Sequence, residues 1–179
     1  MTSSPQTSSP VVIDTNIVLD IWVYQDPATP SLLNALEQGM LQWLATPPMR
    51  EELLRVLDYP HIAKRREIAE LSAEAVLAHF DGLAKIQAIA PKAPYICKDE
   101  DDQKFIDLAV AHQALLLSKD KQVLRLSNRL ARLGVAVRKT WPLEKILNKY
   151  SFMKIYMIKW LYLSHYEQEE HHEQHKNDS

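Results

Sequence analysis

The sequence contains one cysteine, Cys97, and only three glycines among its 179 residues. A single cysteine excludes a disulfide framework within the chain and a zinc site built from several cysteines, and it fits the reducing cytoplasm. Phosphate-cradling loops such as G-x-G-x-x-G need several glycines close together, and the chain does not have them. We therefore expect neither a disulfide-stapled fold nor a glycine-loop nucleotide-binding fold.

Strong charge of one sign and long apolar runs are also missing. The formal net charge of −2 excludes a strongly basic protein that binds nucleic acid by bulk electrostatics, so any such contact is local. No uninterrupted apolar stretch reaches the roughly 18 residues that a membrane-spanning helix needs. The opening MTSSPQTSSP has neither the basic nor the apolar part of a secretion signal. We predict a soluble cytoplasmic protein without membrane contact, in which residues 1–10 form a flexible lead.

What the chain does have is a regular alternation of apolar runs and amphipathic segments. Hydrophobic residues make up 46% of the sequence, which is enough for a real core. Apolar runs predict strands at residues 11–14, 41–46, 115–118 and 135–137. Helical spacing predicts helices from about residue 16, over 31–39, 49–60, 103–114 and 121–134, and two weaker ones within 61–88. Such alternation implies an α/β fold with a central, mostly parallel sheet covered on both faces.

Acidic residues lie where these predicted strands end. In an open parallel sheet the ligand crevice lies beyond the carboxyl ends of the strands. Asp14 closes the first strand and Asp120 follows the run at 115–118, so we expect both at that edge. Glu52 flanks the apolar face of its helix, and Asp102 begins the buried face of its own. We predict that these four carboxylates meet in one pocket.

Four carboxylates in one pocket repel each other. At about 4 Å and an effective dielectric near 20, each like-charged pair costs roughly 4 kcal/mol. Either some of the carboxyl groups keep their protons, or a cation lies between the carboxylates. Oxygen-only ligands favour Mg²⁺ or Mn²⁺ over zinc, and two such ions roughly 3.5–4 Å apart can activate a water and stabilise the leaving oxygen. The acids therefore predict metal-assisted hydrolysis of a phosphodiester.

Four stretches carry a family resemblance: VVIDTN, EELLRVL, DEDDQKFIDLA and LLLSKD. Over about residues 11–140 the sequence resembles the PIN-domain ribonucleases, and most closely the branch regarded as toxins of bacterial toxin–antitoxin systems. In that family an Asp ends the first strand in a D-x-N-like motif, and a helix supplies a Glu. A second Asp starts a helix about 18 residues before a third, which lies in a [T/S]-x-D turn. The positions that fill this pattern are Asp14, Asn16, Glu52, Asp102, Ser118 and Asp120.

The resemblance implies a three-layer α/β/α sandwich and cleavage of RNA that depends on Mg²⁺ or Mn²⁺. It further implies a homodimer bound to an antitoxin protein. The four matched acids would be both the metal ligands and the catalytic groups. We expect Asn16 and Ser118 to orient a carboxylate or a water rather than to bind the metal directly.

Each acid also has a structural alternative. Asp14 and Asp120 each precede a helix and are good N-caps. Within the run 99–102, part of the charge is expected only to cap the helix or to solvate its first turn. The neighbouring acids that compete with Glu52 and Asp102 are Glu51, Asp99 and Asp101.

Two basic clusters are candidates for phosphate contacts, although a solvated helix face explains them nearly as well. One is residues 64–66. The other follows Lys119 and Lys121 at helical spacing and consists of Arg125, Arg129 and Arg132.

Two rival functions remain at this point. A phosphatase of the haloacid-dehalogenase type needs a second Asp two residues after the first, where this sequence has Asn16. The other rival is a non-catalytic PIN-like binding module that acts through a protein partner.

Residues 141–179 are predicted to be a C-terminal extension unlike the usual family ending. An apolar run at 152–163 is expected to pack on the domain or on a partner, and the last part is expected to be disordered.

Overall fold

The structure, a computed structural model, describes residues 8–141. Five strands of this region form one sheet, parallel throughout, in the order β3-β2-β1-β4-β5. The strands are β1 (Ser9–Ile13), β2 (Leu41–Ala45), β3 (Ala84–Ile86), β4 (Leu115–Leu117) and β5 (Val137–Arg138). The chain builds outward from β1 first to one side and then to the other. The carboxyl ends of β1 and β4 therefore flank the switch point, where open α/β sheets bind their ligands.

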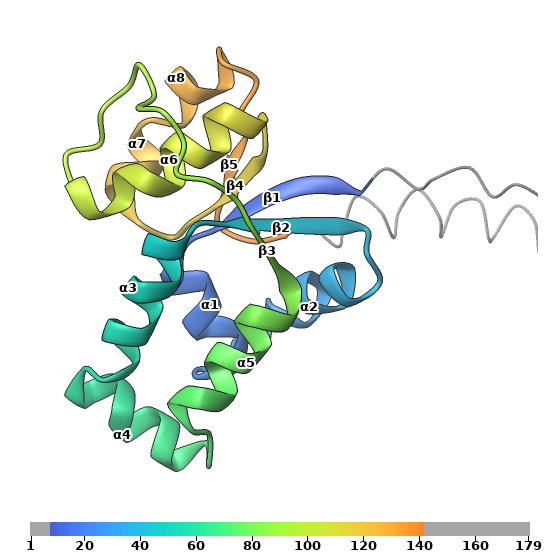
Figure 1. The fold of residues 1–179 in the computed structure, drawn as a ribbon, viewed down its shortest axis with the longest axis vertical. Coiled ribbons are helices and arrows are strands. Elements are labelled where there is room, and N and C mark those ends of the chain that lie inside the picture. The colour runs from blue at the N-terminus through green and yellow to red at the C-terminus, as the bar shows by residue number, and fades with distance from the viewer. Residues whose placement is uncertain (1–7, 142–179) are drawn as a thin grey trace, which may run out of the picture. The chain divides into compact units, whose positions relative to one another are not determined.

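Helices join successive strands and lie on both faces of the sheet. They are α1 (Thr15–Trp22), α2 (Pro30–Glu37), α3 (Pro47–Leu57), α4 (Pro60–Ile68), α5 (Ala73–Leu83), α6 (Glu100–His112), α7 (Lys121–Arg125) and α8 (Ser127–Ala131). In Figure 1, α6, α7 and α8 lie above the sheet, and α1, α2, α3 and α5 lie below it. The α/β/α sandwich expected from the sequence is confirmed.

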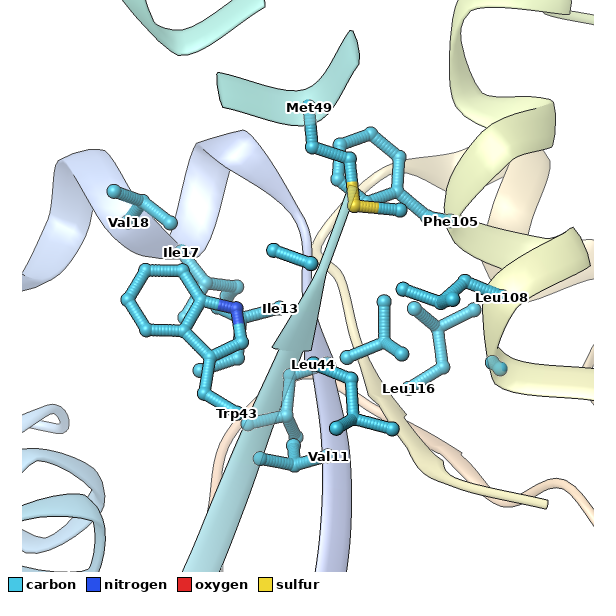
Figure 2. Packing of buried hydrophobic residues seen from close by; sticks show 14 of the residues in the cluster. Val11, Ile13, Ile17, Val18, Trp43, Leu44, Met49, Phe105, Leu108 and Leu116 are labelled. Atoms are coloured by element: carbon cyan, nitrogen blue, oxygen red, sulfur yellow. The ribbon is translucent and has the colours of Figure 1, made fainter. Parts of the chain in front are cut away.

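Burial on both faces of the sheet explains why its central strands are continuous apolar runs in the sequence. Neighbouring residues of a strand point to opposite faces, and here both faces are covered. On β2, Trp43 points toward Ile17 of α1, whereas Leu44 points the other way, toward Leu108 of α6 (Figure 2). All four side chains are buried. The two packed layers hold the strand ends in fixed positions relative to the helices that start there.

Four parts of the described chain differ from the sequence prediction. Strand β3 lies in the stretch 61–88 that was expected to be helical. The sequence did not indicate it, because a strand of three largely exposed residues shows no apolar pattern. Residues 121–134 form two short helices, α7 and α8, instead of one. Strand β1 begins at Ser9, which pairs with Leu41, so it includes two residues of the predicted lead, and β5 begins at Val137 rather than at 135.

The predicted C-terminal extension, with its apolar run at 152–163, lies outside the described residues apart from residue 141. Among the helices that the structure describes, none is both long enough and apolar enough to cross a membrane.

Candidate functional site

The candidate site starts at the central strand, where β1 ends and α1 begins. Asp14 follows β1 directly, is 3% exposed and caps α1. Its Oδ1 accepts a hydrogen bond from the backbone N of Asn16 at 3.4 Å, and its Oδ2 accepts one from Asn16 Nδ2 at 2.7 Å. Burial raises the pKa of Asp14, the hydrogen bonds from Ser118 and Asn16 oppose that rise, and the charge of Glu52 adds to it. Asp14 is thus both the N-cap of α1 and a buried carboxylate of the candidate site.

A chain of hydrogen bonds joins the ends of β1 and β4. The fully buried Ser118 Oγ donates to Asp14 Oδ2 at 2.5 Å and accepts from the backbone N of Asp120 at 3.0 Å. Asn16 Oδ1 accepts from the backbone N of Lys119 at 3.1 Å. The two polar residues of the motifs therefore fix the Asp14 carboxylate and the turn before Asp120 in one arrangement, which is what an orienting role requires.

Asp120 begins α7 and is only partly buried. Its Oδ1 accepts hydrogen bonds from the backbone N of Gln122 at 2.5 Å and of Val123 at 3.3 Å, so it is the N-cap of that helix. The cap uses Oδ1 alone, and Oδ2 is left for a ligand. As with Asp14, capping a helix does not prevent Asp120 from binding a metal ion.

Glu52 reaches the site from α3 with two partners of its own. Thr15 Oγ1 donates to Glu52 Oε1 at 2.7 Å, and the ammonium of Lys104 forms an ion pair with Oε2. The rival Glu51 is exposed. Sequence reasoning missed Thr15 and Lys104, although both lie inside the quoted motifs: Thr15 next to Asp14, and Lys104 in DEDDQKFIDLA.

Asp102 lies in the first turn of α6, which begins at Glu100, three residues before the predicted start. Its neighbours in the acidic run behave as solvated charges. Asp99 caps α6 by accepting a hydrogen bond from the backbone N of Asp101 at 3.0 Å, and Glu100 and Asp101 are exposed. Of the run, Asp102 alone is partly buried.

The charges of the four predicted acids act on one another. Asp102 has a pKa raised from 3.8 to about 7, first by burial and then by the charges of Asp14, Asp120, Asp99 and Glu52. These acids come from the end of β1, the middle of α3, the start of α6 and the turn between β4 and α7. Residues far apart in the sequence are therefore gathered at one edge of the sheet.

A sequence profile of the PIN domain matches residues 10–122, which include all four acids. The chain belongs to the PIN domain family. PIN domains are generally nucleases and generally use divalent metal ions. Among solved structures the chain is similar to the PIN domain of RRP44 from T. brucei, with a TM-score of 0.40 and 11% sequence identity over 87% of this chain and 86% of that chain. No curated protein matches the sequence significantly.

The four acids of this PIN domain are chemically suited to bind a hard divalent cation. The donors are carboxylate oxygens, the ligands that Mg²⁺ and Mn²⁺ prefer. Burial first, and then the charges of the neighbouring acids, raise the pKa of Asp102, and a nearby cation would oppose both effects by favouring the ionised carboxylate. Within residues 8–141, however, no three Asp, Glu, His or Cys side chains already lie close enough to hold one ion together. Ion binding would therefore require the side chains to draw together.

Two of the basic residues that the sequence offered as phosphate contacts are used by the fold. Lys119 Nζ forms ion pairs with Asp20 and Asp26, each at 2.7 Å, which tie the turn after β4 to α1 and the loop behind it. Arg66, from the predicted cluster at 64–66, donates to the backbone oxygens of Leu57 and Leu71. Their cationic groups are therefore engaged within the domain rather than free for phosphate.

Proposed function

We propose that this PIN domain is an endoribonuclease that hydrolyses phosphodiester bonds of RNA with Mg²⁺ or Mn²⁺. The observation that carries the proposal is that hydrogen bonds join the segments of the acids: Ser118 links Asp14 to the turn before Asp120, and Thr15, next to Asp14, binds Glu52. Asp102 lies within reach of their charges, because its pKa is raised first by burial and then by the charges of Asp14, Asp120, Asp99 and Glu52. Carboxylates from separate segments that repel one another in this way are suited to share a divalent cation. The family membership supports the same reaction class.

Asp14, Asp102 and Asp120 would hold the ion. When bound, it supplies a Lewis acid for phosphoryl oxygens and lowers the pKa of a coordinated water. The chain's own part is to hold one ligand, Asp14, in place while the other carboxylates draw toward the ion. Ser118 and Asn16 hold both oxygens of Asp14, so this carboxylate needs little reorganisation when a cation arrives.

Glu52 differs from the other acids because it already has a cationic partner. Lys104 neutralises part of its charge, and Thr15 fixes its Oε1. Glu52 can join the ligands directly only if Lys104 withdraws. In the proposed enzyme, Glu52 therefore completes the acidic pocket as a fourth ligand once the ammonium has moved, and Lys104 limits the repulsion before the ion binds.

The proposal is tested by incubating the purified full chain with a 5′-labelled single-stranded RNA in Mn²⁺, in Mg²⁺ and in EDTA. We expect internal cleavage with at least one ion and none in EDTA. A protein carrying Asp14→Asn, purified in the same way, controls for contaminating nucleases. Cleavage that is equal in EDTA, or equal with this variant, would contradict the proposed mechanism.

The second candidate is a PIN-like binding module without turnover. It is favoured by one observation: in the described part of the chain no three ligating side chains form a ready ion site. Calorimetry with Mn²⁺ separates the two, because a competent pocket binds the ion and the bound ion raises the melting temperature. Absence of both metal binding and cleavage would favour the module.

We further propose that the chain acts as the toxin of a bacterial toxin–antitoxin pair, as a homodimer that a protein antitoxin inhibits. This proposal rests on the resemblance of the four motifs to that branch of the family. Induced expression of the chain in bacterial cells is expected to arrest growth, and the Asp14→Asn variant is expected not to. Equal growth with both proteins would remove the toxin assignment and leave the nuclease assignment standing.

A further inference from the structure

A basic pocket is lined by residues of α7 and α8, by Leu126 between them and by the segment before α6. Its volume is about 260 Å³, and its lining residues are Ile96, Lys98, Gln122, Arg125, Leu126 and Arg129. Ile96 is exposed and Leu126 is buried, so the floor is apolar while three cationic side chains stand around it. We call this the α7 pocket.

The three cations of the α7 pocket are free of acidic partners. None of them takes part in an ion pair within residues 8–141, in contrast to Lys104 and Lys119. Arg125 donates a hydrogen bond to Gln122 Oε1 at 3.0 Å, and the guanidinium of Arg129 lies 6.0 Å from the ring centroid of Tyr95. All three cationic side chains are exposed. Unpaired guanidinium groups beside an apolar surface suit a phosphate that carries a planar group.

The chain connects the α7 pocket directly to the acidic site. The backbone N of Gln122, which lines the pocket, donates to Asp120 Oδ1. On the opposite wall, the backbone N of Cys97, between Ile96 and Lys98, donates at 2.6 Å to the side chain of Gln103, the residue after Asp102. The two walls of the pocket are therefore fixed to the two segments that supply Asp102 and Asp120.

We propose that the α7 pocket is a nucleotide subsite, which binds a backbone phosphate of the RNA strand next to the scissile phosphate and receives its base against Ile96 and Leu126. The inference rests on the proposed ribonuclease function and adds where the substrate strand is held. Phosphate contacts from Arg and Lys fix the register of a nucleic acid without reading its sequence. An apolar surface tolerates any base, because every base has a flat face.

The test compares two double variants with the same change in charge. Arg125→Gln/Arg129→Gln removes two cations from the α7 pocket, and Lys85→Gln/Lys92→Gln removes two exposed cations, one from β3 and one from the loop that follows it. Binding of fluorescein-labelled single-stranded oligouridylate is measured by anisotropy in EDTA at several salt concentrations, and KM and kcat are measured with Mn²⁺. Melting curves check that both proteins fold, and Lys98→Gln provides a second, independent change in the pocket.

We expect the α7 pocket variant to bind RNA about tenfold more weakly, with a higher KM and nearly unchanged kcat. The slope of log affinity against log salt is expected to fall by about 0.7 for one lost phosphate contact. Lys98→Gln is expected to act in the same direction, and the Lys85→Gln/Lys92→Gln variant is expected to behave like the unchanged protein. Weaker binding in the pocket variant without cleavage by any protein would keep the subsite and overturn the nuclease.

Unchanged RNA affinity and KM in both pocket variants would overturn the subsite, while metal-dependent cleavage by the same proteins would leave the proposed function intact. An acidic peptide, poly-glutamate, serves as a competing probe. If the pocket variants lose affinity for the peptide but not for RNA, the pocket belongs to a protein partner and the proposal fails.

Discussion

Replacing Asp102 with asparagine is expected to abolish metal-dependent RNA cleavage and, at the same time, to stabilise the metal-free protein. The amide keeps the shape of the side chain but carries no charge to share with a cation. A fall in cleavage rate of about 10³-fold corresponds to roughly 4 kcal/mol of transition-state stabilisation, a fitting share for one anionic ligand. Without metal, the same change removes the cost of burying this charge and the repulsion from Asp14 and Asp120. The free energy of unfolding in EDTA is expected to rise by about 1 kcal/mol, a value discounted because Asp102 is partly exposed to solvent.

The gain in stability has a defined pH dependence. The pKa of Asp102 in the folded protein is about 7, above its usual value of 3.8. Between these values the folded protein holds the proton and the unfolded chain does not, so this group costs increasing stability as the pH rises toward 7, and the cost stays constant above that. The difference between the two proteins is therefore expected to be largest at about pH 8 and to vanish near pH 4. Chemical denaturation in EDTA measures it.

Asp101→Asn is the matched control, since it makes the same chemical change one residue away in the same helical turn. Asp101 is exposed, and it is not among the charges that act on Asp102. We expect it to leave both cleavage and stability nearly unchanged. If Asp102→Asn destabilised the metal-free protein at alkaline pH, or if the control variant had the same effect, the acids would not form a strained common pocket.

The sequence allowed the four acids to be placed because the rule involved is geometric. Parallel strands end at one edge, so Asp14 and Asp120 could be assigned to that edge from the runs before them. Likewise, helical spacing separated the partly buried Glu52 from the exposed Glu51. What the pattern could not show is the state of the carboxylates, since burial and neighbouring charge depend on how the segments pack.

Contacts between segments account for most of what was missed. The pair of Lys104 and Glu52 joins α6 to α3, and no local pattern encodes it. Lys119 was grouped with candidate phosphate contacts, yet its ammonium is held by Asp20 and Asp26. Strand β3 was missed for a related reason: its short, exposed stretch becomes a strand through pairing with β2. Periodicity detects an element that buries one face, and it does not detect partners chosen by tertiary structure.

Removing the hydroxyl of Ser118 is expected to weaken cleavage by about 10- to 100-fold, because an outer residue that orients a ligand carries an effect of that size. Ser118 Oγ connects Asp14 Oδ2 with the backbone N of Asp120, and it is fully buried. In Ser118→Ala, the Asp14 carboxylate loses a donor that lowers its pKa, so burial raises that pKa further. Asp14 must be ionised to bind a cation. The loss of cleavage is therefore expected to be greatest at acidic pH and to shrink as the pH rises, and a pH profile of kcat/KM measures it.

Two further variants separate the orienting role of Ser118 from its part in stability. Ser118→Ala also leaves the partly buried backbone N of Asp120 without its acceptor, which costs about 1–3 kcal/mol. Ser72→Ala removes the N-cap of α5, where Ser72 Oγ accepts from the backbone N of Ala75 at 3.1 Å, at a similar cost of about 1 kcal/mol and far from the acids in the sequence. It is expected to lower the melting temperature without shifting the pH profile, and Ser118→Thr, which keeps the hydroxyl, is expected to retain the unshifted profile. A profile that stays in place in Ser118→Ala, with only the melting temperature reduced, would show that this hydroxyl supports the fold and does not tune Asp14.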